Sequence, residues 1–379
     1  MDSNPLRKLE AFGQSIWTDF IGRQMVEGGG LQRYVLNDGV SGVTSNPSIF
    51  EKAIAESHEY DGAIQELAKK GRSPEEIYDI LTVEDIQHTA DVLRPTFDRL
   101  EGADGFVSLE VSPKLANDTR GTIDEARRLW KKVDRPNVMI KVPGTGAGLP
   151  AIRQLIQEGI NVNITLLFGL PRYRDVIEAY ISGMESRAGK REPLKGVSSV
   201  ASFFLSRIDV LMDPLLEKKA QSGTAGSEIA GALVGTTAIA SAKIAYRIYG
   251  EMFSARRFQK LAGIGAKTQR LLWASTSTKN PKYPDVKYVE PLIGQNTINT
   301  VPLETLNAYR DHGRPELTLT KGVDEAALNL DQINKMGIDL DGATLQLEKE
   351  GVQKFVNAYD LLMNALRQKA SEFAPKGAA

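Results

Sequence analysis

A lysine inside an apolar segment is the most informative chemical feature of this sequence. Lys141 lies between Ile140 and Val142 in VMIKVPG, which has the pattern of a buried strand. Lysine is almost never fully buried unless its charge is paired, and burial lowers the pKa of its ammonium group. A neutral amine can attack a carbonyl carbon and form a Schiff base. Lys141 is therefore a candidate nucleophile, and the alternative is a lysine at the strand mouth with its ammonium in water.

Two carboxylic acids occupy similar places in other apolar segments. Glu110 lies in GFVSLEVS and Asp19 lies in QSIWTDFI. Schiff-base chemistry needs proton transfers when the carbinolamine forms and dehydrates and when a carbon–carbon bond breaks, and two carboxylates can divide these tasks. The alternative is that both acids form salt bridges to Lys141 without taking part in chemistry.

Further polar residues recur near the C-terminal ends of the apolar segments. Two of the later segments are also followed by residues that could bind an anion. Hydroxyl and amide groups suited to a polyhydroxylated substrate are Thr44, Asn46, Asn163, Thr165 and Ser202, although each alone is also a common strand-end cap. Arg207, Ser275, Ser277 and Lys279 follow later segments and predict a phosphate site. The alternative for Arg207 is a salt bridge to Asp209.

The elements that must position these residues are short apolar runs alternating with helical segments, the pattern of parallel strands joined by crossover helices. Eight candidate strands lie near residues 14–21, 39–46, 105–112, 137–144, 160–168, 197–204, 269–276 and 286–294. Eight such strands predict an α/β fold, a single (β/α)8 TIM barrel whose active site lies at the C-terminal strand ends. A doubly wound sheet is the alternative.

The chain is longer than such a barrel requires, so part of it must form additional elements. We expect residues 1–379 to form one domain, with additional helices near 47–104, 208–268 and 302–379, the last a helical C-terminal extension. Within the predicted helices, Thr122–Glu125 has the pattern of a capping box, which predicts a helix start.

Composition limits the classes of function and partner. Lys plus Arg is 47 and Asp plus Glu is 48, so the basic excess typical of nucleic-acid-binding proteins is missing. There is no cysteine, and the three histidines are scattered, so no metal site is expected. The longest charge-free apolar stretch, residues 229–242, is shorter than the about 18 residues of a membrane span. We expect a cytoplasmic protein, either monomer or homodimer, that binds neither nucleic acid nor membrane.

In the segments that contain these residues, the sequence resembles the transaldolase family. The motifs that carry the resemblance are GVTSNPSIF at 42–50, SLEVSP at 108–113, VMIKVPGT at 138–145, NVNITLLF at 161–168 and SFFLSRID at 202–209. They occur in the order of the family and cover most of the barrel portion. The WAST segment at 273–276 and the chain length make the longer bacterial transaldolases most similar.

The resemblance implies a class I Schiff-base transferase with no metal or organic cofactor. Its substrates would be sugar phosphates of the pentose phosphate pathway. A dihydroxyacetone unit would pass from sedoheptulose 7-phosphate to glyceraldehyde 3-phosphate, giving erythrose 4-phosphate and fructose 6-phosphate. Lys141 would attack the ketone, Asp19 would take the proton of the C4 hydroxyl, and Glu110 would act through a water held with Thr165.

The resemblance also implies which residues bind the substrate. Residues matching the dihydroxyacetone site are Thr44, Asn46, Asn163 and Ser202, and Arg207 matches the phosphate-binding arginine. Many family members have a second arginine shortly after the serine of the seventh strand. In this sequence Ser277 occupies that place, and we expect Lys279 to substitute as a point charge.

Two other functions remain alternatives. A Schiff-base aldolase would release free dihydroxyacetone from fructose 6-phosphate, and related aldolases have Tyr where this chain has Phe204. A phenylalanine cannot orient a water beside Glu110, which favours transfer over cleavage. A non-catalytic sugar-phosphate-binding barrel is the third function, and the presence of Lys141, Glu110 and Asp19 together argues against it.

Overall fold

Eight parallel strands close into a barrel in the computed structural model of this chain, which describes residues 4–55 and 57–373. Each strand pairs with the next in chain order, and β8 pairs with β1. The strands are β1 (Gln14–Thr18), β2 (Val40–Val43), β3 (Phe106–Glu110), β4 (Val138–Pro143), β5 (Val162–Leu167), β6 (Ser199–Phe204), β7 (Arg270–Ala274) and β8 (Thr297–Val301). The predicted (β/α)8 barrel is confirmed.

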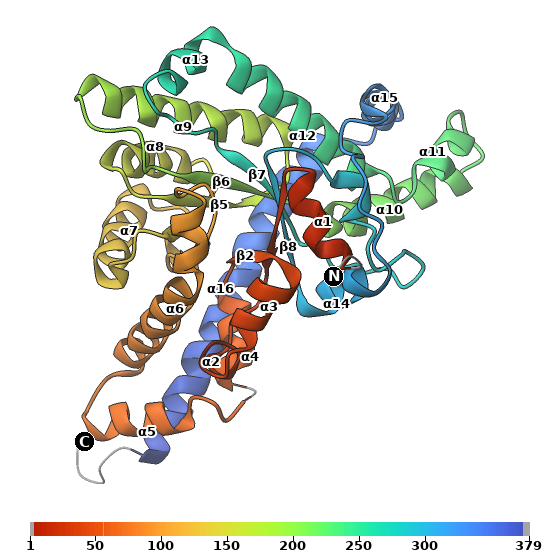
Figure 1. Ribbon diagram of the computed structural model, residues 1–379. Coiled ribbons are helices and arrows are strands. Elements are labelled where there is room, and N and C mark those ends of the chain that lie inside the picture. The colour runs from red at the N-terminus through yellow and green to blue at the C-terminus, as the bar shows by residue number, and fades with distance from the viewer. Residues whose placement is uncertain (1–3, 56, 374–379) are drawn as a thin grey trace.

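Helices surround the barrel and fill the connections between its strands (Figure 1). Before β3 the helices are α1 (Pro5–Ala11), α2 (Arg23–Glu27), α3 (Gly30–Asp38), α4 (Pro47–Ala55), α5 (Asp61–Lys69) and α6 (Pro74–Arg99). Between β3 and β6 they are η1 (Pro113–Leu115), α7 (Thr119–Val133), α8 (Gly148–Glu158) and α9 (Leu170–Gly189). Between β6 and β8 they are α10 (Ser206–Gln221), α11 (Ser227–Leu233), α12 (Thr237–Ser254), α13 (Arg256–Ala262) and η2 (Glu290–Leu292). After β8 follow α14 (Leu303–His312), α15 (Val323–Lys335) and α16 (Leu340–Phe373).

The long helix α16 connects opposite parts of the molecule. It packs against α4 and α5, which follow β2, and it also contacts η1 after β3 and the end of β5. Figure 1 shows α16 running past the strands towards α5. The helix therefore lies across segments that extend from the C-terminal ends of several strands.

The eighth strand was predicted in the wrong place. Residues 286–294 contain the short helix η2, and their apolar side chains Val286, Val289 and Ile293 pack with α1 and α14 instead of entering the sheet. The true strand is TINTV at 297–301. It escaped detection because its threonine and asparagine side chains resemble a loop, whereas in the barrel they are buried and hydrogen-bonded, as Asn299 is to the Tyr288 carbonyl.

The predicted start of the helix after β3 was also wrong, because the N-cap is four residues earlier than the predicted Thr122. Helix α7 begins at Thr119, and Asp118 accepts a hydrogen bond from Gly121 N at 3.0 Å as its N-cap. Thr122 lies inside the helix, where its hydroxyl donates to the Leu115 carbonyl at 2.9 Å. Aspartate is at least as good an N-cap as threonine, so the earlier residue starts the helix.

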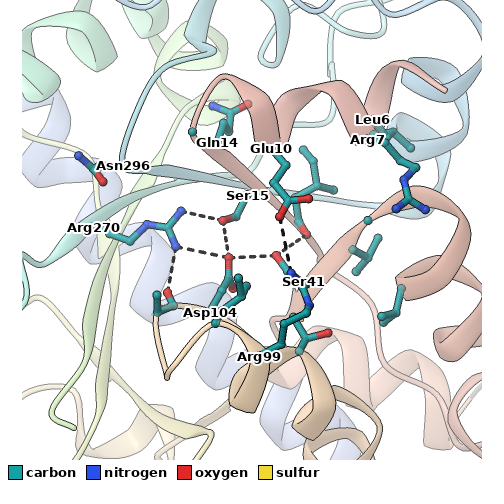
Figure 2. Close-up of a pocket in the computed structure, with 18 residues that line it drawn as sticks. Leu6, Arg7, Glu10, Gln14, Ser15, Ser41, Arg99, Asp104, Arg270 and Asn296 are labelled. Carbon is teal, nitrogen blue, oxygen red and sulfur yellow. Dashed lines mark hydrogen bonds and ion pairs between the residues drawn. The ribbon is translucent and has the colours of Figure 1, made fainter. Parts of the chain in front are cut away.

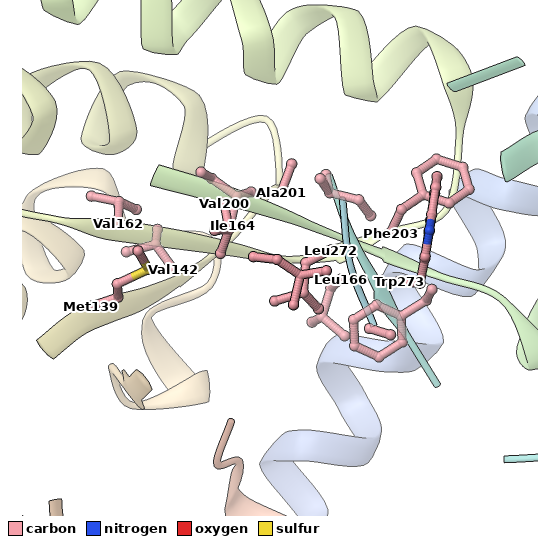
Figure 3. Close-up of a cluster of buried hydrophobic side chains, with 14 of the residues drawn as sticks. Met139, Val142, Val162, Ile164, Leu166, Val200, Ala201, Phe203, Leu272 and Trp273 are labelled. Atoms are coloured by element: carbon pink, nitrogen blue, oxygen red, sulfur yellow. The ribbon is translucent and has the colours of Figure 1, made fainter. Parts of the chain in front are cut away.

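Apolar side chains of neighbouring strands form a continuous core between the barrel and its helices (Figure 3). Val142, Ile164, Phe203 and Trp273 come from four successive strands and are fully buried. Their burial stabilises each strand by about 1.5–3 kcal/mol per side chain. This core fixes the positions of the strands β4 to β7 that carry most of the candidate site.

Polar residues close the barrel at the N-terminal ends of the strands (Figure 2). Asp104 accepts hydrogen bonds from Trp17 Nε1 at 2.8 Å and from Ser41 Oγ at 3.0 Å. Arg270 lies 3.4 Å from the same carboxylate and donates to Ser15 Oγ at 2.7 Å. An open cavity of about 310 Å³ is lined by Asp104, Ser41, Arg270 and Ser15. Because their polar groups bind one another, this end of the barrel is structural, in line with the general behaviour of such barrels.

The helices also allow a test for membrane spans. Within residues 4–55 and 57–373, no single helix is long and apolar enough to cross a membrane. Helices α11 and α12 reach the required length and composition only as a pair, and they are bent by 74° at the break between them.

Candidate active site

The barrel register places the strongest candidates side by side. Lys141 is opposite Glu110 on β3 and opposite Asn163 on β5. Because every strand pair is parallel and the barrel is closed, the C-terminal ends of all strands surround one opening. Residues from segments that are far apart in the sequence thereby come together.

Lys141 is buried, with 4% of its surface exposed. Its Nζ donates a hydrogen bond to the Ser45 backbone carbonyl at 3.1 Å and lies 3.6 Å from Glu110 Oε2. The amine is therefore held by one carbonyl and one carboxyl group inside the barrel. The alternative of a lysine that extends into water is wrong.

Glu110 is a buried acid with unused hydrogen-bonding capacity. Burial raises the pKa of its carboxyl group to about 7, although the nearby Lys141 acts in the opposite direction. Neither carboxyl oxygen has a hydrogen-bond partner among the described residues. A carboxyl group that changes protonation near neutral pH is suited to exchange protons with a water molecule or a substrate.

Asp19 directly follows β1 and is oriented by two threonines. Thr44 Oγ1 donates a hydrogen bond to Asp19 Oδ1 at 2.7 Å and lies 2.7 Å from Thr300 Oγ1 of β8. Burial raises the pKa of Asp19, while the charge of Lys141 and the Thr44 hydrogen bond lower it. The second oxygen of this carboxyl group remains available to a substrate hydroxyl.

Amide and hydroxyl groups of neighbouring strands form a short chain of hydrogen bonds. Ser202 Oγ donates to Asn163 Oδ1 at 2.7 Å, and Asn163 Nδ2 donates to Ser108 Oγ at 2.9 Å. Asn46 behaves differently, because its Oδ1 accepts a hydrogen bond from Ile49 N at 3.0 Å in the first turn of α4. Oδ1 of Asn46 thus has the capping role that was the alternative to substrate binding, while its amide nitrogen makes no hydrogen bond with a described residue.

Thr165 is held at an irregular point of β5. Its hydroxyl is buried and has no hydrogen-bond partner in the described part of the chain. The next residue, Leu166, has a φ of 60°, and the register of β5 with β6 shifts between Ile164 and Leu167. A leucine in this left-handed region carries backbone strain, and such strain is concentrated at functional sites. Helix α16 packs on Leu166, because a Cβ at Gly351 would lie 3.0 Å from its Cδ2.

The two phenylalanines that end β6 have different surroundings. Phe203 packs edge-on against Tyr173 of α9, with ring centroids 6.2 Å apart. Phe204 lies under the guanidinium of Arg207, 5.7 Å from Cζ to the ring centroid. Alternate residues of a strand share a face, so Phe204 is on the same face as Ser202. Phe204 is therefore the phenylalanine that faces the site.

Arg207 is the second residue of α10, and its guanidinium is not paired with Asp209. Its Nη1 is buried without a hydrogen-bond partner among the described residues. Burial lowers the pKa of Arg207, and the charge of Asp19 acts in the opposite direction. Asp209 instead accepts hydrogen bonds from Ala238 N at 2.8 Å and from the Tyr288 hydroxyl at 2.9 Å. The guanidinium is thus available to an anion.

The segment after β7 brings further polar groups to Arg207. Ser275 Oγ lies 2.8 Å from Ser206 Oγ at the start of α10. Lys279 Nζ donates to Ser277 Oγ at 2.5 Å. Loss of water around its ammonium lowers the pKa of Lys279, and the positive charge of Arg207 adds to this effect. Two cationic groups therefore face the same region, as a phosphate site requires.

Three residues of the site were not predicted. Ser108 could have been found, because it lies two residues before Glu110 and so on the same face of the strand. Thr300 was hidden by the wrong placement of the eighth strand. Ser45 gave no signal, because it holds Lys141 through its backbone carbonyl and not through its side chain.

Comparison with known proteins decides the family of this chain. A family model described as "Transaldolase/Fructose-6-phosphate aldolase" matches residues 16–366. The chain belongs to this family. The transaldolase of Thiobacillus denitrificans is 46% identical over 95% of this chain and 99% of that protein. The transaldolase of Thermobifida fusca is 45% identical over 97% of this chain and 98% of that protein. Transaldolase 2 of a Nostoc species is 44% identical over 99% of this chain and 100% of that protein. The transaldolase resemblance seen in the motifs is confirmed.

Proposed function

We propose that this chain catalyses the transaldolase reaction. It transfers a dihydroxyacetone unit between sedoheptulose 7-phosphate and glyceraldehyde 3-phosphate, giving erythrose 4-phosphate and fructose 6-phosphate. The observation that carries the proposal is the buried amine of Lys141, 3.6 Å from Glu110 in the barrel of a family member. The names of the relatives support the same reaction. The pentose phosphate pathway and a cytoplasmic location are parts of this proposal.

The chemistry begins with the transfer of the Lys141 proton. Glu110 in its charged form accepts a proton, and the neutral amine attacks the ketone carbon of the substrate. Loss of water from the carbinolamine gives the Schiff base. The carboxyl oxygens of Glu110 and the hydroxyl of Thr165, which have no hydrogen-bond partner among the described residues, are suited to hold the water that carries these protons.

Carbon–carbon bond cleavage then needs a base at the C4 hydroxyl. Asp19 serves this step, because Thr44 fixes one of its oxygens and leaves the other for the substrate. The C3–C4 bond breaks, the aldose leaves, and the dihydroxyacetone unit remains on Lys141 as an enamine. The acceptor aldehyde enters, and the same steps run in reverse.

The remaining polar residues bind the two ends of the substrate. Groups for the dihydroxyacetone hydroxyls are Thr44, Asn46, Asn163 and Ser202, and groups for the phosphate are Arg207, Ser275, Ser277 and Lys279. Phe204 lies beside the phosphate-binding set, because its ring lies under the guanidinium of Arg207. This arrangement accepts a phosphorylated ketose with its ketone near Lys141.

Reductive trapping tests the proposal directly. Borohydride with fructose 6-phosphate should leave a reduced three-carbon adduct on Lys141, and Lys141→Ala should abolish both the adduct and sedoheptulose 7-phosphate formation in a coupled assay. Lys267→Met is the matched control, because Lys267 is a half-buried lysine that binds the Gly102 carbonyl at the other end of the barrel. An adduct on another lysine, or full activity of Lys141→Ala, would reject the assignment.

A Schiff-base aldolase is the second candidate function, because the matched family includes fructose-6-phosphate aldolase. An aldolase must hydrolyse the enamine, which requires protonation of its carbon and addition of water to the imine. Phe204 faces the site and offers no hydroxyl for that water. This residue favours transfer to an acceptor over release of dihydroxyacetone.

A further inference from the structure

Two buried carboxylates of α10 have no part in the chemistry described above. Asp209 and Asp213 lie four residues apart, which places them on one face of the helix. They are 1% and 7% exposed. A buried charge is costly unless it is paired and hydrogen-bonded, so the partners of these carboxylates reveal what the two residues hold.

Asp213 joins the segment after β7 to the turn before α12. Its Oδ2 accepts a hydrogen bond from the Tyr283 hydroxyl at 2.6 Å, and its Oδ1 accepts one from Gly235 N at 2.7 Å. Gly235 has a φ of 77°, and a Cβ there would lie 2.6 Å from the Tyr283 hydroxyl oxygen. Glycine at this turn therefore allows Tyr283 to reach the carboxylate.

Asp209 holds the same segment at a second place. Lys287 Nζ lies 3.0 Å from Asp209 Oδ2, which also accepts the hydrogen bond of the Tyr288 hydroxyl. Lys287 Nζ lies 3.3 Å from the centre of the Tyr283 ring, a cation–π contact that connects the two carboxylate sites. We call the connected set the α10 clamp; its members are Asp209, Asp213, Tyr283, Lys287 and Tyr288.

The beginning of the segment is attached to α10 as well. Ser206 N donates to the Ser275 carbonyl at 3.0 Å, and their hydroxyl oxygens are 2.8 Å apart. Ser277 and Lys279 lie between this attachment and the α10 clamp, and Arg207 directly follows Ser206. The distance between Lys279 and Arg207 thus depends on how the segment is held against α10.

We propose that Asp209 and Asp213 are positioning residues for phosphate recognition. Through the α10 clamp they hold residues 275–288 so that Lys279 and Arg207 bind one phosphate together. The clamp also engages Asp209, so that Arg207 forms no ion pair with Asp209 or with another carboxylate in the described part of the chain and is ready for the substrate. The inference rests on the proposed function, because it specifies how that site recognises a phosphorylated sugar when a second arginine is missing.

Tyr283→Phe tests the clamp with a minimal change, since it removes one hydroxyl and keeps the ring beside Lys287. We expect the KM for fructose 6-phosphate and the Ki of inorganic phosphate to rise together by about 3- to 10-fold, the effect of one lost hydrogen bond. We expect kcat to stay unchanged. With fructose, which has no phosphate, KM should also stay unchanged.

Three further variants separate positioning from a general loss of structure. Asp213→Ala should raise the same two constants. Asp213→Asn, whose oxygen can still accept from Gly235 N and whose amide nitrogen can donate to the Tyr283 hydroxyl oxygen, should restore most of the affinity. Combining Tyr283→Phe with Asp213→Ala should add nothing to Asp213→Ala alone, because both remove the same bond. Tyr173→Phe is the matched control, since that buried hydroxyl has no hydrogen-bond partner among the described residues.

The outcomes distinguish the clamp from the proposed reaction. The positioning role would be overturned if a variant changed the KM for fructose and the KM for fructose 6-phosphate equally. It would also be overturned if neither Tyr283→Phe nor Asp213→Ala changed the KM for fructose 6-phosphate. If the unaltered chain converts neither donor, the proposed function is wrong. Calorimetric titration of the unaltered chain and of Tyr283→Phe with inorganic phosphate then still tests the positioning role. That role requires the variant to bind phosphate more weakly.

Discussion

At the scale of single residues, Glu110 is buried and Asp19 is partly buried, and their partners give the two acids different tasks. Asp19 has one oxygen fixed by Thr44, so its direction is set. Neither oxygen of Glu110 accepts a hydrogen bond from a described residue, although Oε2 lies 3.6 Å from Lys141 Nζ, and the pKa of Glu110 is raised to about 7. Glu110 is therefore the acid that changes protonation at neutral pH, while Asp19 supplies a base with a fixed position.

The raised pKa of Glu110 predicts how the reaction depends on pH. Above about pH 7 the carboxyl group is charged and accepts a proton, and below that pH it is protonated and cannot. We therefore expect kcat/KM for fructose 6-phosphate to fall as the pH drops through about 7. Glu110→Gln should lower the rate by about 10²- to 10⁴-fold and remove this acid limb. If kcat/KM of Glu110→Gln still falls as the pH drops through about 7, the ionisation belongs to another group.

The position of Phe204 predicts what separates transfer from cleavage. In Phe204→Tyr a new hydroxyl would enter the site beside Arg207 and could hold the water needed to hydrolyse the enamine. We expect more free dihydroxyacetone from fructose 6-phosphate and a lower transfer rate. Phe203→Tyr is the control, because Phe203 packs on α9. The ratio of release to transfer, measured with and without acceptor aldehyde, tests the idea, and an unchanged ratio in Phe204→Tyr would show that this residue does not protect the enamine.

At the scale of elements, β5 and α16 act together at the catalytic opening. Leu166 takes a left-handed conformation directly after Thr165, and α16 approaches Leu166 at Gly351. Strain of about 1–3 kcal/mol at such a residue persists only where the surrounding packing maintains it. We infer that α16 keeps the Thr165 hydroxyl directed into the site, although the helix itself lies outside the barrel.

A pair of glycine substitutions tests this coupling. Gly250→Ala in α12 meets no atom within 4 Å, so it should stabilise the protein by up to about 1 kcal/mol without changing activity. Gly351→Ala gains the same helix propensity, but its methyl group must displace Leu166. We expect a lower kcat and a smaller gain in unfolding free energy for Gly351→Ala. Identical behaviour of the two variants in denaturant unfolding and in kinetics would contradict a role for α16 in the site.

At the scale of the whole molecule, the sequence predicted the barrel but misplaced the strand that closes it. Seven strands were recognisable because apolar runs with β-branched residues mark buried parallel strands. The eighth, at 297–301, is polar, and its identity depends on hydrogen bonds with distant segments. The bulge at Leu166 and the α10 clamp are equally invisible in the sequence, since both depend on contacts between elements. Lys141, Glu110 and Asp19 were predictable because charged groups in apolar strands are rare.

The polar network at the N-terminal end of the barrel predicts a stability effect that is separate from activity. Asp104 binds Trp17, Ser41 and Arg270, so Asp104→Ala removes the carboxylate that accepts from Trp17 Nε1 and Ser41 Oγ and leaves Arg270 without its ion-pair partner. Removing one partner of a buried ion pair costs about 3–5 kcal/mol, and we expect a loss of that size in the free energy of unfolding by denaturant. The kinetic constants of the folded protein should stay unchanged, because Lys141 lies at the other end of the strands. Asp91→Ala removes an exposed partner of Arg135 and should change stability by less than about 1 kcal/mol. If both aspartate variants lose equally little, the network does not hold the barrel closed.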